Sequence, residues 1–333
     1  MSEPDEISPD LDREIASWLA ANEAEPTQQT DPVPDVGEFR RLSHERNALA
    51  LARMNPALIP ASETESEIDG PGGALPIRVL RPVGEGPRPT VVYFHGGGWT
   101  VGDIDTHLGH ARRICTQADA VVVSVAYRRA PEDRFPAAFD DAVTATNWVG
   151  SQLAELGGDP NVLVVAGDSV GGQLAASVAI ARRDAGQPLS AQLLLYPVTD
   201  AAGRYADDRI NATYFSRRSA AEGYGLTLRD MTEFASFYVD DADSADWRVS
   251  PLRARDLTGV APAVVHTATL DVLRTEGNFY AQAMERAGVA VTAREWPTLN
   301  HSYFGLGGVS AVADSAAAQA AEDLRALLAS SRA

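Results

Sequence analysis

A serine flanked by glycines at the end of an apolar run is the chain's strongest sign of chemistry. Residues 162–172 read VLVVAGDSVGG, which places Ser169 in the pattern Gly-x-Ser-x-Gly. Between a strand and a helix, this pattern holds a serine on a sharp turn with its hydroxyl exposed. Gly167 and Gly171 suit such a turn, because side chains at these positions would collide across it. The motif therefore indicates a nucleophilic serine.

A second glycine-rich turn follows another strand-like run. Residues 91–99 read VVYFHGGGW. The consecutive glycines offer free backbone N–H groups at a strand end, which is what an oxyanion hole requires. Together the two turns indicate acyl transfer through a serine. The alternative interpretation is that both are ordinary tight turns between a strand and a helix.

A serine hydroxyl is a weak nucleophile near neutral pH and needs a histidine base. In the fold that carries Gly-x-Ser-x-Gly, the chain order is serine, then acid, then histidine. Only His266 and His301 follow Ser169 in the sequence. His266 stands inside the apolar run AVVHTAT, which favours a strand residue with a local hydrogen bond. His301, in PTLNHSYF, follows a strand-like run, and we expect it to be the base.

The base needs a carboxylate that fixes its tautomer. Asp271 comes directly after the strand-like run AVVHTAT and is the predicted acid. It could also cap the helix that follows, a role compatible with catalysis. Glu276 is the nearest rival, but its place within that helix points it elsewhere, and Asp246 and Asp256 stand in polar loops. Asp168 is interpreted as structural, with hydrogen bonds to the backbone of the HGGG turn, and His95 is expected to order the same turn.

Composition excludes several classes of function. The 333 residues carry a formal net charge of −18, which argues against nucleic acids and anionic membrane surfaces as partners. A single cysteine, Cys115, rules out an intrachain disulfide and a thiolate metal site, and we interpret it as buried packing. His44, His107 and His110 lack ligand-like partners in the sequence. We therefore expect neither a metal nor a cofactor.

The first ten residues, MSEPDEISPD, are acidic and lack the apolar stretch of a signal peptide. No apolar run approaches the length of a membrane span. The expectation is a soluble cytoplasmic protein that acts on a small molecule.

Residues 1–70 are predicted to form a helical segment distinct from the rest. Two amphipathic stretches flank a Pro-rich linker, and their apolar stripes must be buried. Docking on the following domain is the simplest solution, and self-association as a homodimer is the alternative. The stripe residues are Leu11, Ile15, Trp18 and Leu19 in the first helix and Phe39, Leu42, Leu49 and Met54 in the second.

Residues 71–333 are predicted to form one α/β domain. Strand-like runs alternate with helical segments, and their continuous Val-rich character favours a mostly parallel sheet covered on both faces. The alternation stops between about residues 199 and 250, where no strand pattern is visible. We expect this insertion and the N-terminal helices to form a cap over the active site; a plain surface excursion is the alternative. The strand-like runs are LPIRVL, TVVYF, AVVVSVAY, NVLVVAG, AQLLLYP, AVVHTAT and VTAREW.

From about Leu75 to its end, the chain resembles the bacterial hormone-sensitive-lipase-like esterases of the α/β-hydrolase fold. That resemblance implies Ser169 as nucleophile, Asp271 as acid and His301 as base. It also implies an oxyanion hole built from the N–H groups of Gly96, Gly97 and Val170. The segments that carry it are HGGGWTVGD, YRRAPEDRFPAAFDDA, GDSVGG, SPLRARDLTGVAPAVV, LDVLRTEG and EWPTLNHSYF.

The resemblance implies a serine carboxylesterase for short-chain acyl esters, with Trp99 lining the substrate site or packing under the cap. An amide or formamide hydrolase with the same triad is the first alternative. A non-catalytic ligand-binding receptor is the second, although such receptors typically lose a triad member. The chain departs from the usual family pattern at Val170, where alanine is common, at Val272, where proline is common, and at Ser302-Tyr303. None of these changes removes a required group.

Overall fold

The computed structural model describes residues 10–22, 35–55, 57–221 and 223–330. Within these residues, eight strands form one sheet in the order β1-β2-β4-β3-β5-β6-β7-β8. Strand β2 is antiparallel to both of its neighbours, and every other pairing from β4 to β8 is parallel. The strands are β1 (Ser62–Gly70), β2 (Gly73–Arg81), β3 (Arg88–Phe94), β4 (Val121–Val125), β5 (Gly158–Asp168), β6 (Ala191–Leu195), β7 (Ala263–Leu270) and β8 (Val291–Asn300).

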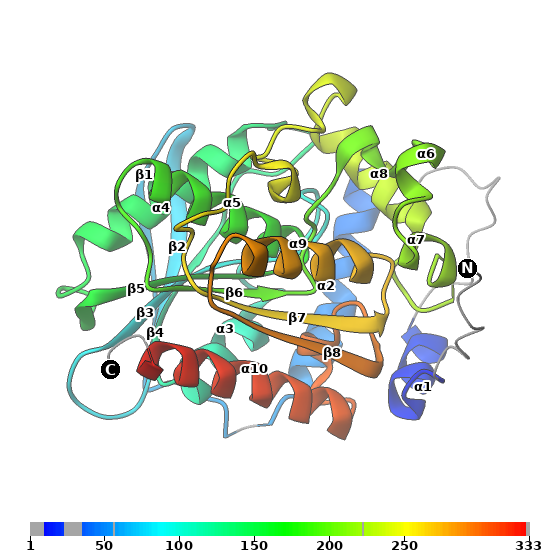
Figure 1. Ribbon diagram of the computed structural model, residues 1–333. Helices are drawn as coiled ribbons and strands as arrows, with labels where there is room; N and C mark the ends of the chain where they lie inside the picture. The colour runs from blue at the N-terminus through cyan, green and yellow to red at the C-terminus, as the bar shows by residue number, and fades with distance from the viewer. Residues whose placement is uncertain (1–9, 23–34, 56, 222, 331–333) are drawn as a thin grey trace.

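The central strands are apolar on both faces because helices cover both sides of the sheet. Along β3, Val92 and Phe94 face one hydrophobic core, whereas Val91 and Tyr93 face the other. The first core lies under α4 (Ala137–Ser151), α5 (Val170–Asp184) and α9 (Arg274–Arg286). The second lies under α3 (Leu108–Gln117) and α10 (Ala311–Ser330). Figure 1 shows this three-layer arrangement, which confirms the predicted α/β-hydrolase architecture.

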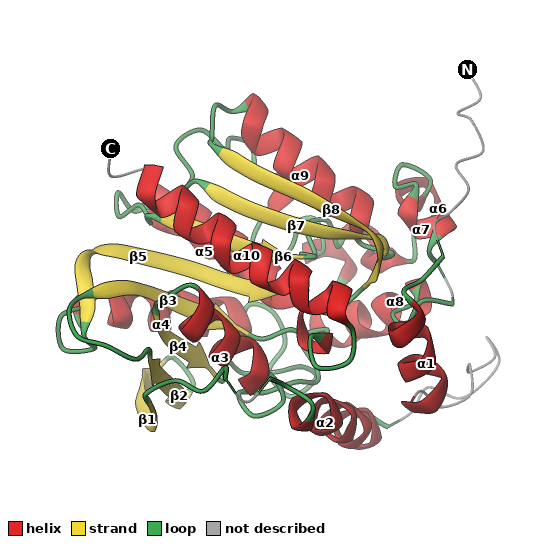
Figure 2. Ribbon diagram, turned by 90° about the horizontal axis from the view of Figure 1, so that it is seen from below, coloured by secondary structure: helices red, strands yellow, loops and turns green. Residues whose placement is uncertain are grey.

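The remaining helices gather at the end of the sheet toward which the parallel strands point (Figures 1 and 2). They come from the N-terminus and from the segment between β6 and β7, the two parts of the chain predicted to form a cap. Within residues 199–250 the described part of the chain contains no strand, as expected. These elements are α1 (Arg13–Asn22), α2 (Val36–Ala52), the short η1 (Ala202–Tyr205), α6 (Asp208–Asn211), α7 (Ser216–Ser219), α8 (Leu228–Tyr238) and η2 (Asp241–Asp243).

Helix α1 docks on the domain as its apolar stripe predicts. Ile15 and Trp18 are buried in the second core, and Arg53 lies over the Trp18 ring at 4.7 Å. Helix α2 is held differently, by Arg40, which donates to Glu132 and to the carbonyl oxygens of Thr100 and Ala130. Contacts within the same chain therefore hold both helices on the domain. Self-association as a homodimer stays a prediction.

The predicted apolar stripe of α2 is only partly correct. Leu42 and Leu49 are exposed, and Ala50 and Leu51 are directed inward in their place, whereas Met54, just after the helix, contacts α3 as predicted. A polar anchor such as Arg40 allows a helix to dock without a continuous apolar face, so hydrophobic spacing alone misassigned two residues.

All seven predicted strands are present, and one strand was not predicted. Residues 62–70 form β1, which pairs along its whole length with β2. This strand lies at the sheet edge and is exposed at most positions, so it lacks the apolar pattern that identified the others. The predicted boundary at residue 70 therefore falls inside a hairpin of the sheet.

The acidic residues 1–9 lie outside the described part of the chain. In the described part, no helix has the length and apolar character needed to cross a membrane.

Candidate active site

Ser169 stands at the junction between β5 and α5, as the Gly-x-Ser-x-Gly pattern predicts. Its backbone is strained, with φ 55° and ψ −122°. A Cβ atom on Gly167 would lie 2.1 Å from the carbonyl oxygen of Gly171, and one on Gly171 would lie 2.0 Å from that of Phe94. Both positions therefore exclude any side chain, and the turn can close only with glycine.

Asp271 and His301 follow directly on the neighbouring strands β7 and β8. The Nδ1 atom of His301 lies 2.8 Å from Oδ2 of Asp271, and both residues are buried. The other carboxylate oxygen of Asp271 accepts the N–H of Leu273 at 2.9 Å, which fixes the carboxylate plane. The structure thus brings the predicted acid and base into hydrogen-bond contact.

The end of β6 connects this pair to the serine turn. The N–H of Ser169 donates to the carbonyl oxygen of Leu195, the last residue of β6, at 2.9 Å. The next residue, Tyr196, presents its ring edge-on to His301, with 4.8 Å between ring centroids. Because β5 to β8 are parallel, the residues that follow these strands meet at one edge of the sheet.

The HGGG turn differs in one respect from the predicted oxyanion hole. The N–H of Gly96 donates to Oδ1 of Asp168 at 2.9 Å, so it is not free to bind an oxyanion. No hydrogen bond to the N–H groups of Gly97, Gly98 or Val170 is found among the described residues. Gly97 and Gly98 have φ values of 117° and 57°, which turn the backbone away from the strand. Gly98 therefore takes the place of Gly96 among the candidate donors.

Comparison with known proteins decides the family. A family profile described as alpha/beta hydrolase fold matches residues 91–305. The carboxylic ester hydrolase LipN of Mycobacterium tuberculosis is 42% identical over 259 residues, 74% of this chain and 66% of LipN. The chain belongs to the hormone-sensitive-lipase-like esterases of the α/β-hydrolase fold. It is therefore a carboxylic ester hydrolase.

Two further relatives extend over nearly the whole of this esterase. The ethyl acetate hydrolase of Pseudomonas putida is 36% identical over 298 residues, 87% of this chain and 90% of that protein. The solved structure of a hyperthermophilic esterase from Pyrobaculum calidifontis superposes with a TM-score of 0.85 at 31% identity. That superposition covers 96% of this esterase and 99% of the archaeal chain, so it includes the sheet and most of the helices predicted to form a cap.

Trp99 does not line an open substrate pocket in this esterase. Its side chain is completely buried, its ring stacks on Tyr238 of α8 at 4.6 Å, and Nε1–H donates to Gln173 of α5 at 2.9 Å. These contacts favour the packing alternative over the predicted substrate contact. Trp99 joins the HGGG turn to α5 and α8.

Two residues rejected as catalytic candidates have other partners. The Nε2 atom of His266 lies 2.9 Å from Oδ2 of Asp323 on α10, the local hydrogen bond expected of a strand histidine. Glu276 is completely buried and pairs with Arg217 of α7, which is also completely buried. It also accepts the N–H of Thr199 at 2.8 Å. Burial raises the pKa of Glu276, while Arg217 acts in the opposite direction. Glu276 therefore ties α7 and the end of the β6 segment to α9.

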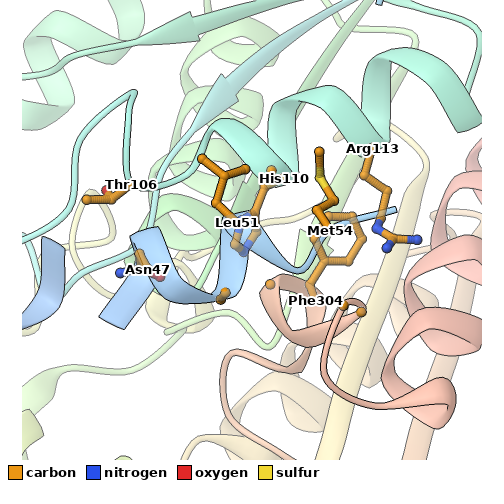
Figure 3. Close-up of a pocket in the computed structure, with 12 residues that line it drawn as sticks. Asn47, Leu51, Met54, Thr106, His110, Arg113 and Phe304 are labelled. Atoms are coloured by element: carbon orange, nitrogen blue, oxygen red, sulfur yellow. The ribbon is translucent and has the colours of Figure 1, made fainter. Parts of the chain in front are cut away.

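A small cavity of about 20 Å³ lies where α2 meets α3 and the short helix η4 (Tyr303–Leu306). Figure 3 shows that Leu51 and Met54, His110 and Arg113 of α3, and Phe304 of η4 line it. A cavity of this size holds one water molecule. It lies close to the helical turn that begins two residues after His301.

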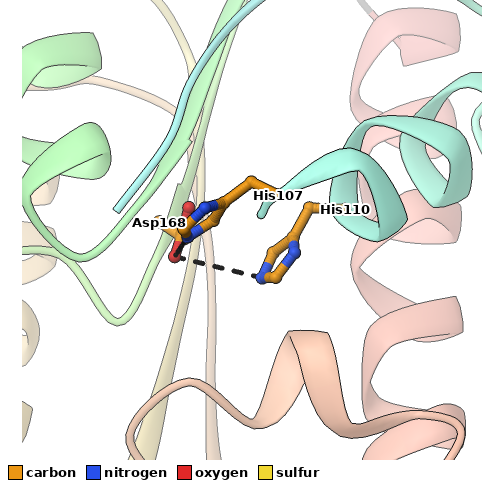
Figure 4. Close-up of side chains that lie close together, drawn as sticks. All are labelled: His107, His110 and Asp168. Carbon is orange, nitrogen blue, oxygen red and sulfur yellow. Dashed lines mark ion pairs between the residues drawn. The ribbon is translucent and has the colours of Figure 1, made fainter. Parts of the chain in front are cut away.

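One cluster of buried side chains was not predicted from the sequence. His107 and His110, thought to lack ligand-like partners, converge on Asp168, and their ligand atoms all lie within 4.8 Å of one another (Figure 4). Asp168 also accepts the hydroxyl of Tyr93 at 2.6 Å. Burial disfavours the charged carboxylate, yet the histidines and Tyr93 lower its pKa well below the usual range. The signal in the sequence was the spacing of two histidines three residues apart, which places both on one side of a helix start.

Proposed function

We propose that this esterase hydrolyses short-chain carboxylic esters through an acyl-enzyme formed on Ser169. The hydrogen bond of 2.8 Å between His301 and Asp271, beside the strained Ser169 turn, is the observation that carries the proposal. This arrangement supports a serine nucleophile, a histidine base and a carboxylate that orients the base. Helices α1 and α2 and residues 199–250 form the cap over this site.

In the first half-reaction the Ser169 hydroxyl oxygen attacks the ester carbonyl carbon. Nε2 of His301 takes the hydroxyl proton, and Asp271 holds Nδ1–H and stabilises the imidazolium. The carbonyl oxygen becomes an oxyanion that the N–H groups of Gly97, Gly98 and Val170 bind. His301 then gives its proton to the departing alkoxide, which leaves as the alcohol, and the acyl group stays on Ser169.

In the second half-reaction water replaces the alcohol. His301 removes a proton from the water, whose oxygen attacks the acyl carbonyl carbon and forms a second oxyanion. When this intermediate collapses, the Ser169 oxygen leaves and recovers its proton from His301. The products are a carboxylic acid and free enzyme.

The packing above the oxyanion turn supports a small acyl group. A Cβ atom on Gly98 would lie 2.2 Å from the ring of Phe234 on α8, so this ring lies directly over the turn. Phe39 of α2 contacts Phe234, with 5.8 Å between the ring centroids. Two aromatic rings from separate parts of the cap thus restrict the space beside the reacting carbonyl. The Pseudomonas putida relative named for ethyl acetate agrees with this size.

A panel of p-nitrophenyl acetate, butyrate and laurate tests the proposal. We expect acetate and butyrate to be hydrolysed fastest, with a pre-steady-state burst that marks the acyl-enzyme. Ser169→Ala should abolish the burst and labelling by a fluorophosphonate, whereas Ser151→Ala, on the exposed side of α4, should change neither. Near-normal turnover by Ser169→Ala would refute the mechanism.

The same preparation distinguishes the two alternative functions. Hydrolysis of acyl amides matched to the esters tests the first alternative. An amide hydrolase should turn over the amides and the esters at comparable rates. Failure of the wild-type chain to react with the fluorophosphonate would favour the non-catalytic receptor instead.

A further inference from the structure

Three buried side chains behind the nucleophile turn point their polar atoms at one another. Nε2 of His107 lies 3.6 Å from Oδ2 of Asp168, and Nε2 of His110 lies 4.0 Å from the same oxygen. All three residues are more than nine-tenths buried. The histidines come from the start of α3 and the aspartate from the end of β5, as Figure 4 shows. These separations are too long for direct hydrogen bonds.

Thr106 orients the His107 ring. The Thr106 hydroxyl lies 3.0 Å from Nδ1 of His107, and the same hydroxyl contacts the carbonyl oxygen and the N–H of Asp103 at 3.0 and 2.7 Å. In the tautomer that carries its proton on Nδ1, Nε2 of His107 presents a lone pair to the Asp168 carboxylate.

His110 presents a second nitrogen without a partner. Its Nε2 is buried, and no hydrogen bond to it is found in the described part of the chain. Oδ2 of Asp168 and the Nε2 atoms of His107 and His110 thus surround a position from which one cation would contact all three atoms.

We propose that His107, His110 and Asp168 bind one Zn²⁺ ion or a similar first-row divalent metal ion. Two imidazoles and a carboxylate form a ligand set typical of zinc, with bonds of about 2.0–2.2 Å. A tetrahedral ion with such bonds separates its ligand atoms by about 3.4 Å. The separations from Asp168 to the two histidines are 3.6 and 4.0 Å, and that between the histidines is within 4.8 Å, so side-chain rotations must bring the imidazoles closer together.

The surroundings hold two of the three ligands in place. The second carboxylate oxygen of Asp168 accepts both the Tyr93 hydroxyl and the Gly96 N–H, and Thr106 fixes the His107 ring. Such hydrogen bonds orient metal ligands and strengthen binding.

Titration of the untagged, chelator-treated chain with ZnCl₂ in a calorimeter tests the proposal. We expect one equivalent of Zn²⁺ to bind and to raise Tm, because the ligands converge only in the folded chain. His110→Gln and His107→Gln should each weaken binding at least about 100-fold, more than the loss of a second-layer partner. His44→Gln, an exposed histidine on α2, should leave binding unchanged.

A spectroscopic measurement locates the ion independently of ester hydrolysis. Co²⁺ in this site should show the visible absorption of a tetrahedral complex, retained in Ser169→Ala and lost in His110→Gln. Far-UV circular dichroism and Tm confirm that the variants fold; should His107→Gln fail to fold, His110→Gln decides alone. Absence of binding to the wild-type chain, or equal binding by folded His110→Gln, overturns the proposal.

Discussion

At the scale of single residues, the orientation of His301 depends on Asp271. In the proposed mechanism the carboxylate accepts Nδ1–H and leaves Nε2 free as the proton acceptor, whereas an amide in its place favours the opposite tautomer. We predict that Asp271→Asn lowers kcat by up to about 10⁴ with little change in fold. Steady-state hydrolysis of p-nitrophenyl acetate measures this loss. Asp256 is an exposed loop residue, and the Asp256→Asn variant serves as the control. A loss of only a few-fold in kcat of the Asp271→Asn variant would indicate a different acid.

The backbone of the HGGG turn gives a second residue-scale prediction. A Cβ atom on Gly97 would lie 2.2 Å from the carbonyl oxygen of Val101, and φ of 117° is strained for any other residue. Gly97→Ala should displace the turn and lose at least one oxyanion donor, lowering kcat about 10²–10³-fold. Gly186→Ala is a matched control, because its φ is also positive and no atom lies within 4 Å of the added Cβ. Equal losses in both variants would exclude a specific role for the turn.

Single residues also show where sequence reasoning ends. Ser169, Asp271 and His301 could be singled out because each follows an apolar run in a fixed chain order. Which glycine N–H groups are free could not be predicted, since this depends on how closely Asp168 approaches Gly96 across two strands. The contact of Asp168 with His107 and His110 likewise joins residues about sixty positions apart, beyond the reach of local patterns.

At the scale of elements, the apolar residues of a buried strand or helix make it predictable from the sequence. Strands β2 to β7 could be predicted from their apolar residues, most of which are buried in the two cores. Strand β8, the other edge strand, is exposed along much of its length but was predicted from the run VTAREW. Strand β1 could not be predicted, because nearly all of its residues are polar. The cap was predicted from a missing strand pattern, but its contacts were not. Phe234 meets the HGGG turn and Phe39 meets Phe234 only after three separate segments have folded together.

The cap helix α8 therefore carries a prediction about substrate size. If the Phe234 ring limits the acyl group, Phe234→Ala should raise the ratio of kcat/KM for laurate over acetate esters at least about tenfold. One methylene in an apolar pocket changes discrimination by about 1–3 kcal/mol, so an aromatic ring suffices for this effect. Phe237→Ala removes a ring that packs against the core from the same helix and controls for general loosening of the cap. The same change of ratio in both variants would contradict the assignment.

At the scale of the whole molecule, the net charge of −18 stays largely at the surface, while the interior holds neutral and paired groups. The imidazoles of His95 and His110 are buried, and burial is the main reason that the pKa of each falls to about 3. In the unfolded chain these histidines regain their ordinary pKa near 6.5. The folded and unfolded states therefore bind different numbers of protons between pH 3 and 6.5.

This difference predicts acid destabilisation of the whole fold. Above pH 6.5 His110 is neutral in both the folded and the unfolded chain, so its contribution to stability is constant. Below pH 6.5 the unfolded chain binds an extra proton, and the free energy of unfolding falls with pH until about pH 3. Each such histidine lowers the free energy of unfolding by about 1.4 kcal/mol per pH unit. Urea unfolding with EDTA at pH 7 and pH 5 measures the loss. The His110→Gln variant should lose about 2 kcal/mol less unfolding free energy between pH 7 and pH 5 than the wild type. His44 is exposed on α2, so the His44→Gln variant should show the same loss as the wild type. Parallel pH profiles for wild type and His110→Gln would mean that this imidazole becomes protonated without unfolding.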